Sequence, residues 1–320
     1  MENNLHDHMK RFWEINENHV THIKSEEELE CEKHFTATFK HAEDSRFEVS
    51  LPLKRDVQSL GESRSGAEKR LLAMERRFRK DQTIKERYHE YLDEFLELGH
   101  MTEILDLEPG LRNYLPHHAV LKESSTTTKV RVVKDGSFKT TTGISMNDCV
   151  MVGPVVQQEL FLIIVRFRQH QFVVTGDIVK MYRQIWIKPE HRNLQCILWR
   201  KEPDQPMRTY QLNTVTFEVT SSPYQATRCL VQLSEECKET HPLASRVIQE
   251  DFYVDDMLSG GETEEEVDAI VKEVKEVLQS AGFELQKFYS NKIDKDNEIK
   301  DHDLTEIKTL GMRWQLEVII

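Results

Sequence analysis

Two adjacent aspartates, Asp255 and Asp256, stand between apolar residues. The segment before them ends in Phe252-Tyr253-Val254, which has strand composition, and Met257 and Leu258 can begin a second strand. This pattern predicts a tight hairpin that carries both aspartates at its turn. A divalent cation would relieve the repulsion between two neighbouring carboxylates, which makes a metal site one interpretation. An ordinary exposed Asp-Asp turn is the other, and these residues alone do not separate the two.

A third carboxylate belongs to a separate apolar segment. Residues 172–178 read Phe-Val-Val-Thr-Gly-Asp-Ile, so that Asp177 stands at the end of a predicted strand, and Lys180, Tyr182 and Arg183 follow it. Phosphoryl transfer with two metal ions needs carboxylates from more than one segment. Asp177 therefore adds to the metal interpretation of Asp255 and Asp256.

Basic residues gather in the middle of an acidic chain. The whole chain of 320 residues has a net charge of −13, whereas residues 111–200 hold 13 Lys and Arg against 6 Asp and Glu, a net charge of +7. Lys129 and Arg131 alternate along a predicted strand, which places both on one face where they could grip phosphates. The distribution favours a local phosphate-binding surface over chance clustering.

Composition excludes several other classes of protein. No run of about 18 apolar residues is present, and the first residues lack the basic and apolar pattern of a signal peptide, so we expect an intracellular protein that does not enter a membrane. Five scattered cysteines form no Cys-x-x-Cys pair, which argues against a disulfide framework or a zinc site.

Helix and strand signals alternate along the chain and must position these residues. Capping patterns and apolar periodicity predict helices at residues 25–35, 67–78, 83–98, 154–168, 222–239 and 263–281. Ser222 and Pro223 form an N-cap and first-turn pair at the start of the fifth helix. Strands are predicted at residues 194–200, 208–215 and 283–289, with a hairpin around 310–314.

Several of these motifs together resemble the reverse transcriptase of Bel-Pao LTR retrotransposons. The similar segments are Tyr-Leu-Pro-His-His-Ala-Val at 114–120, Thr-Lys-Val-Arg-Val-Val at 128–133, the segments around Asp177 and Asp255, and Thr-Val-Thr-Phe-Glu-Val-Thr-Ser-Ser-Pro at 214–223. The resemblance implies an α+β fold: the fingers and palm of a right-hand polymerase with a ferredoxin-like palm sheet, preceded by a small, mostly helical lead-in. It divides the chain into the lead-in at 1–100 and the polymerase part at 101–320, ending before a complete thumb.

The resemblance also implies roles for individual residues. Asp177, Asp255 and Asp256 would be catalytic and would bind two Mg²⁺ (or Mn²⁺) ions, with Ile178 among the metal ligands. Tyr182 would be the steric gate that favours deoxynucleotides. The residues expected to contact the incoming nucleotide are Lys129, Arg131, Tyr182, Phe217, Ser222 and Pro223.

By this resemblance, the chain is an RNA-directed DNA polymerase that binds an RNA or DNA template with its primer and deoxynucleoside triphosphates. Two residues depart from the family: Glu218 stands where the family has glycine, and Lys134 stands where it usually has an apolar residue. These departures leave an alternative open, in which the chain is an inactive or co-opted retroelement fragment that binds nucleic acid or has no activity.

Overall fold

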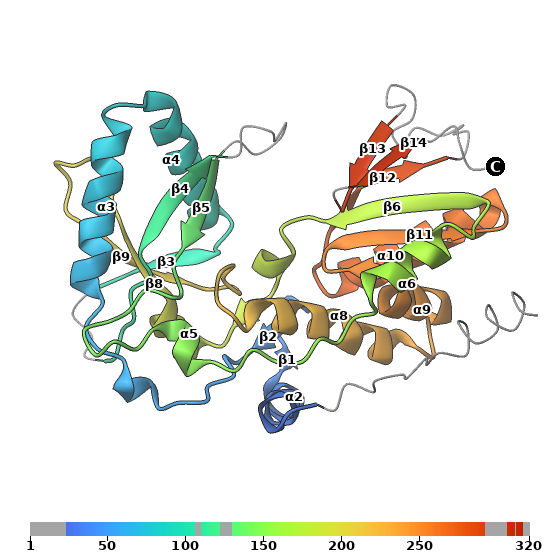
Figure 1. Ribbon diagram of the computed structural model, residues 1–320, viewed down its shortest axis with the longest axis horizontal. Helices are drawn as coiled ribbons and strands as arrows, with labels where there is room; N and C mark the ends of the chain where they lie inside the picture. Colours follow the sequence, from blue (N-terminus) through green and yellow to red (C-terminus); the bar gives the residue numbers. More distant parts are fainter. Residues whose placement is uncertain (1–23, 106–109, 122–129, 292–305, 311, 316–320) are drawn as a thin grey trace, which may run out of the picture.

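The computed structural model describes residues 24–105, 110–121, 130–291, 306–310 and 312–315. Figure 1 shows its elements in two groups, which we call the first lobe and the sheet lobe, with helix α8 (Ser222–Cys237) running beneath and between them. Both lobes share one large hydrophobic core, which includes Tyr88 in the first lobe and Val174 in the sheet lobe. The same core therefore supports the elements of both lobes.

The first lobe packs two long helices against small antiparallel sheets. Helix α3 (Arg64–Phe78) contacts strands β4 (His117–Leu121) and β8 (Cys196–Trp199), and α4 (Gln82–Glu97) contacts β5 (Val130–Lys134). Strands β4 and β5 form a two-stranded ribbon. A three-stranded sheet has the order β3 (Met101–Ile104), β9 (Arg208–Leu212), β8. This lobe draws on both predicted segments, 1–100 and 101–320, and their division stays a prediction.

The sheet lobe is built on four antiparallel strands in the order β10, β11, β6, β12. Their bounds are Phe252–Tyr253, Asp256–Gly261, Phe172–Ile178 and Leu285–Ser290. Side chains of alternate residues leave a strand on opposite faces. Val173 accordingly packs with helix α6 (Leu160–Phe167), whereas Val174 joins the core that includes helix α10 (Glu264–Ser280).

The amphipathic helices of this lobe follow the apolar pattern of the sequence. Thr263 caps α10 by accepting a hydrogen bond from the backbone of Glu266, and Gly282 follows the helix with a φ of 78°. The buried side chains of α10 are Val267, Ile270, Val274, Val277 and Leu278. Helix α9 (Pro242–Glu250) packs against α8 and α10 and leads directly into β10.

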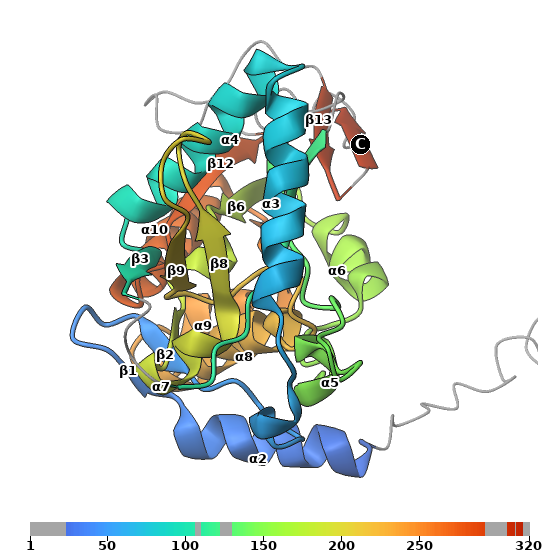
Figure 2. The same ribbon diagram turned by 90° about the vertical axis from the view of Figure 1, so that its left-hand side faces the viewer.

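The amino-terminal elements form the base of the molecule. Helix α2 (Glu26–Thr38) begins at a Ser25–Glu28 capping box, as predicted, and lies across the bottom of Figure 2. Arg228 of α8 donates a hydrogen bond of 2.7 Å from Nε to Glu32 of α2. Strand β2 (Phe47–Val49) pairs with β1 (Lys40–His41) and, in parallel, with β7 (Trp186–Ile187), which ties the base to the first lobe.

Short elements and one further hairpin complete the described chain. The hairpin predicted around 310–314 is confirmed as β13 (Glu306–Thr309) and β14 (Met312–Gln315). The short helices are η1 (Val57–Ser59), α5 (Met146–Cys149), η2 (Met181–Gln184), α7 (Pro189–Arg192) and η3 (Asn193–Gln195). None of the helices in the described part of the chain combines the length and the apolar character needed to cross a membrane.

Three predicted helix starts were wrong. The helix expected at 154–168 begins only at Leu160, because its N-cap Glu159 has an extended backbone with a φ of −62° and a ψ of 135°. Helix α4 is capped by Asp81, whose side chain accepts from the backbone of Ile84, so the Thr83 cap was wrong. At α8 the N-cap is Ser221, one residue before the predicted Ser222.

Candidate active site

The hairpin that carries Asp255 and Asp256 has a two-residue connection. Tyr253 pairs with Asp256, so the turn consists of Val254 and Asp255, and Asp256 is already the first residue of β11. The predicted hairpin is confirmed, although only one of the two aspartates lies in the turn itself. Val254 has a φ of 57°, a left-handed conformation that β-branched residues avoid. The turn is therefore strained at the residue next to Asp255.

The register of the central strands brings Asp177 to this hairpin. Asp177 of β6 is the cross-strand partner of Asp256 of β11, and the backbone N–H of Ile178 donates to the carbonyl of Asp255 at 2.8 Å. Directly opposed residues on antiparallel strands have neighbouring side chains on one face of the sheet. The three aspartates predicted to act together therefore lie at one end of the β6–β11 pair.

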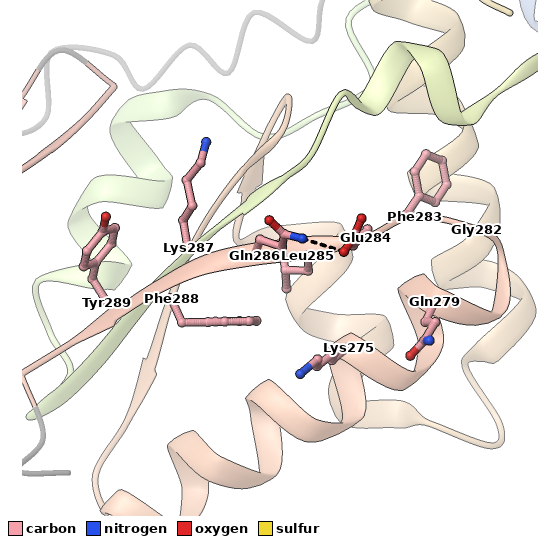
Figure 3. A pocket seen from close by; sticks show the side chains of 10 residues that line it. All are labelled: Lys275, Gln279, Gly282, Phe283, Glu284, Leu285, Gln286, Lys287, Phe288 and Tyr289. Atoms are coloured by element: carbon pink, nitrogen blue, oxygen red, sulfur yellow. Dashed lines mark hydrogen bonds between the residues drawn. The ribbon is translucent and has the colours of Figure 1, made fainter. Parts of the chain in front are cut away.

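A lysine that the sequence analysis missed completes this cluster. Lys287 of β12 places its Nζ 3.3 Å from Oδ2 of Asp177. Its strand pairing with β6 is irregular between Gln286 and Tyr289, and Lys287 itself has a φ of 54°. Such a bulge redirects a side chain that the simple alternation of a strand would place elsewhere. Figure 3 shows Lys287 and Phe288 leaving β12 in opposite directions.

A cavity beside β12 is distinct from the aspartate cluster. Its volume is about 610 Å³, and it is lined by Lys275 and Gln279 of α10 and by residues 282–289 (Figure 3). Lys287 belongs to its lining, but none of the three aspartates does. The surface around the aspartates, and not this cavity, is therefore the candidate site.

The pKa of the Asp255 carboxyl is raised above its ordinary value, and burial is the main cause. Burial raises the pKa of the Asp255 carboxyl, and the nearby charge of Asp177 raises it further. The positive charges of Lys287 and Arg131 act in the opposite direction on the same pKa. Arg131 belongs to β5 of the first lobe, so its charge reaches the aspartates from the other lobe.

The donor set at this end of the sheet fits hard divalent cations. Carboxylate oxygens are the ligands that Mg²⁺ prefers, and a cation would offset the repulsion between Asp177 and Asp255 that raises the Asp255 pKa. In the described residues, no three Asp, Glu, His or Cys side chains converge closely enough to form a ready-made metal cage. The Lys287 ammonium occupies one oxygen of Asp177 in this arrangement. Ile178 could contribute only its carbonyl oxygen, because its side chain is apolar.

Two aromatic rings contact each other, and one of them, Tyr182, lies close to Asp255. The rings of Tyr182 in η2 and Phe217 meet edge to face, with centroids 5.2 Å apart and an interplanar angle of 83°. Burial and then the charge of Asp255 raise the pKa of Tyr182 to about 12, so this phenol is protonated at neutral pH and lies within electrostatic reach of Asp255. Phe217 is 56% exposed. The predicted steric gate and the predicted nucleotide contact are thus in direct contact with each other.

The loop that carries Phe217 is held by hydrogen bonds from both sides. Ser222 is buried and donates its hydroxyl to the carbonyl of Thr216 at 2.6 Å, whereas Pro223 is exposed. Nδ2 of Asn147 donates to the carbonyl of Glu218 at 3.1 Å, and Oδ1 of the same side chain accepts from the backbone of Thr220 at 3.0 Å. Nucleotide contacts by Ser222 and Pro223 stay predictions.

Glu218 adopts a backbone conformation that suits glycine. Its φ is 81°, and its side chain is exposed. Only glycine enters this region without a steric cost, which gives a backbone reason for the glycine that the resemblance expects here. The chain nevertheless adopts this conformation with a glutamate, and Asn147 holds the backbone on its carboxyl side through the Glu218 carbonyl and the Thr220 N–H.

Strand β5 carries both Arg131, a predicted nucleotide contact, and Lys134, the predicted departure from the family pattern. Arg131 is exposed, whereas Lys134 is 3% exposed and points into the first lobe. The Lys134 ammonium lies 4.6 Å and 4.2 Å from the ring centroids of Tyr91 and Phe95 and donates to the Tyr91 hydroxyl at 2.7 Å. Lys134 therefore does not lie on the exposed face with Arg131. Lys129 lies outside the described residues.

Two comparisons with known proteins give results, and a third gives none. A family model described as "Reverse transcriptase (RNA-dependent DNA polymerase)" matches residues 121–312. No curated protein matches the chain.

Among solved structures, the chain is similar to a foamy viral protease–reverse transcriptase in complex with double-stranded DNA. The identity is 18% and the TM-score 0.50, over 72% of this chain and 33% of that one. A second, in complex with an RNA/DNA hybrid, has 18% identity and a TM-score of 0.48 over 63% and 23% of the two chains. The chain thus spans about a third of the first of these relatives, and the likeness concerns the fold.

The fold is accordingly a mixed helix and sheet fold that resembles a retroviral polymerase domain. The sequence match covers more than half of the chain and includes all three aspartates, from Asp177 to Asp256. The chain belongs to the reverse transcriptase (RNA-dependent DNA polymerase) family.

Proposed function

We propose that this chain is an RNA-directed DNA polymerase that extends a primer 3′-hydroxyl by nucleotidyl transfer. The observation that carries the proposal is the pairing of Asp177 with Asp256 across β6 and β11, with Asp255 in the adjoining turn. This register gathers three carboxylates from two segments separated by more than seventy residues of sequence. The family match supports the same conclusion.

Asp177, Asp255 and Asp256 would hold two Mg²⁺ or Mn²⁺ ions, with the Ile178 carbonyl as a further ligand. When bound, such ions supply Lewis-acid activation of the primer hydroxyl and neutralise charge on the triphosphate and the leaving pyrophosphate. Lys287 must release Asp177 for both of its oxygens to become available. Its ammonium then stays close to the developing negative charge, where a cation stabilises the transition state.

The remaining groups position the nucleotide. Arg131 lies in the first lobe, and its positive charge lowers the pKa of Asp255. Its guanidinium can pair with triphosphate oxygens. Lys129, two residues earlier, is proposed to do the same. Tyr182 and Phe217 form an aromatic corner beside Asp255, against which a deoxyribose and base can pack. Ser222 and Pro223 support and flank this corner.

In this proposal the first lobe corresponds to the fingers and the sheet lobe to the palm. The antiparallel order of the four strands, with α6 and α10 packed on opposite faces, supports the assignment of a ferredoxin-like palm. The motifs at 114–120, 128–133 and 214–223 support placement in the Bel-Pao branch, within a Pol polyprotein. The proposed partners are an RNA or DNA template with its primer and deoxynucleoside triphosphates, acting inside the cell. The inactive-fragment alternative is not favoured, because Glu218 is accommodated and Lys134 is turned away from the exposed face of β5.

Primer extension tests this function. Purified protein is incubated with an RNA template, a labelled DNA primer, deoxynucleotides and Mg²⁺ or Mn²⁺. We expect the native chain to extend the primer and Asp255→Asn to abolish extension without lowering the melting temperature by more than about 2 °C, since the exchange keeps size and shape. Asp204→Asn makes the same chemical change at an exposed position in the turn between β8 and β9 and should extend normally. Normal extension by Asp255→Asn would refute the site.

A further inference from the structure

A glutamine outside the aspartate cluster contacts the strained turn directly. Gln157 lies in the loop between α5 and α6, and its Oε1 accepts a hydrogen bond of 2.8 Å from the backbone N–H of Val254. Val254 is the residue with a φ of 57° that precedes Asp255. A two-residue hairpin turn with positive φ at its first position prefers glycine there, so valine needs an external constraint to remain in place.

The loop that presents Gln157 is anchored on three sides. The backbone N–H of Met151 donates to the carbonyl of Pro52 at 2.8 Å. Gly153, with a φ of 84°, lies so close to Tyr224 of α8 that an added Cβ would come within 2.3 Å of that ring. Val156 packs against the main core. The amide of Gln157 thus projects from a fixed support and not from a freely moving segment.

Helix α6, which follows this loop, holds the other end of the hairpin. Arg166 of α6 places its Nε 3.2 Å from Oδ1 of Asp251, the residue just before β10, and its guanidinium also donates to the carbonyl of Glu250. The other oxygen of Asp251 accepts from the hydroxyl of Ser259 in β11 at 2.7 Å. Residues 157–166 therefore contact the hairpin at its tip and at its base.

We propose that Gln157 is a positioning residue, which keeps Val254 in its left-handed conformation and thereby holds the Asp255 and Asp256 carboxylates where they can bind divalent cations together with Asp177. The inference rests on the proposed function for its metal site, but it concerns the geometry of the ligands and not turnover. Without the Gln157 oxygen, Val254 can relax to negative φ, and the carboxylates next to it rotate away from Asp177.

The test compares cation affinity with stability in the full chain. Mn²⁺ binding is measured by electron paramagnetic resonance of the free ion, without nucleotide, and Asp177→Asn identifies the binding that belongs to the site. Gln157→Met keeps the length of the side chain and removes the acceptor. It should weaken the Asp177-dependent binding about fivefold, the effect of one lost hydrogen bond, while the melting temperature stays within about 2 °C of the native value.

Two variants complete the design. Gln157→Glu keeps an oxygen within reach of the Val254 N–H and adds negative charge, so its Mn²⁺ affinity should equal or exceed the native one. Gln158→Met makes the same substitution at the neighbouring, exposed glutamine and should leave the affinity unchanged. In primer extension, Gln157→Met should raise the Mg²⁺ concentration for half-maximal rate by a similar factor and change the KM for deoxynucleotide less.

The outcomes separate this inference from the polymerase proposal. Native Mn²⁺ binding that depends on Asp177, without primer extension, would refute the polymerase function and leave the role of Gln157 to be decided by the affinities. Unchanged affinity in Gln157→Met would overturn the inference even in an active enzyme. Absence of Asp177-dependent binding in the native chain would also overturn it, because no ligand set would remain for Gln157 to position.

Discussion

Replacing Glu218 with glycine should stabilise the protein, because Glu218 occupies a left-handed backbone conformation with a φ of 81°. A residue with a Cβ loses about 1–2 kcal/mol in this region relative to glycine. Glycine in turn has a more disordered unfolded chain, which costs about 0.4–1 kcal/mol of stability. The difference predicts that the free energy of unfolding of Glu218→Gly exceeds that of Glu218→Ala by about 0.5–1 kcal/mol. Alanine is the reference because both variants lose the charge of Glu218.

The assay is thermal unfolding of the two variants side by side. In a chain of this size, such a gain raises the melting temperature by about 1–2 °C. Ser45→Gly is the positive control, since Ser45 has a φ of 67° in the β1–β2 turn. Glu43→Gly is the negative control, because Glu43 is exposed in the same turn and is not among the residues with positive φ.

Either of two results would refute the reasoning about the backbone. If Glu218→Gly melts no higher than Glu218→Ala, or if Glu43→Gly gains as much in melting temperature, then the left-handed conformation is not the source of the stabilisation. Primer extension by the native chain, Glu218→Ala and Glu218→Gly distinguishes an effect of the Glu218 charge on nucleotide binding from an effect of its backbone conformation. A KM for deoxynucleotide that falls equally in the alanine and glycine variants identifies the carboxylate as the obstacle, whereas a fall confined to glycine identifies the backbone.

Two other substitutions test the surroundings of the site. Burial, and then the charge of Arg183, lowers the pKa of Lys134 to about 7. The unfolded chain therefore binds more protons than the native one between about pH 7 and 10.5, and native stability should rise with pH there, by about 2 kcal/mol from pH 7 to pH 9. Urea unfolding of Lys134→Met should lack this rise, and an equal rise in the variant would contradict the assignment. Tyr182→Val removes the ring that contacts Phe217 and should reduce discrimination against ribonucleotides about tenfold or more, measured by competing primer extension; unchanged discrimination would exclude Tyr182 as the steric gate.

The sequence was informative where function rests on short, local patterns. Asp177 ends an apolar strand, and Asp255 and Asp256 interrupt another apolar run, so both signals could be recognised without knowledge of the tertiary fold. Their mutual placement was implied only by the resemblance to a reverse transcriptase, because no local pattern gives the pairing of two distant strands; in the structure Asp177 lies opposite Asp256.

The residues that were missed depend on irregular backbone, which has no periodic signal. Lys287 reaches Asp177 only because β12 contains a bulge at that point, whereas the sequence pattern predicts an ordinary strand. Gln157 was assigned to a helix, although the chain forms a loop there and turns the amide toward Val254. Lys134 was noted as a departure from the apolar residue usual in the family, and only the packing of α4 shows that aromatic side chains enclose it.

Cation binding by Asp177, Asp255 and Asp256 is tested most directly by cleavage of the chain with bound Fe²⁺. Fe²⁺ replaces Mg²⁺ at oxygen-rich sites, and with ascorbate and peroxide it cuts the backbone next to its ligands. With primer, template and the correct deoxynucleotide bound, we predict cuts near residues 177 and 255 that excess Mg²⁺ suppresses and that Asp255→Asn lacks. Cuts confined to other segments, or cuts that persist in Asp255→Asn, would contradict the assignment of the metal site.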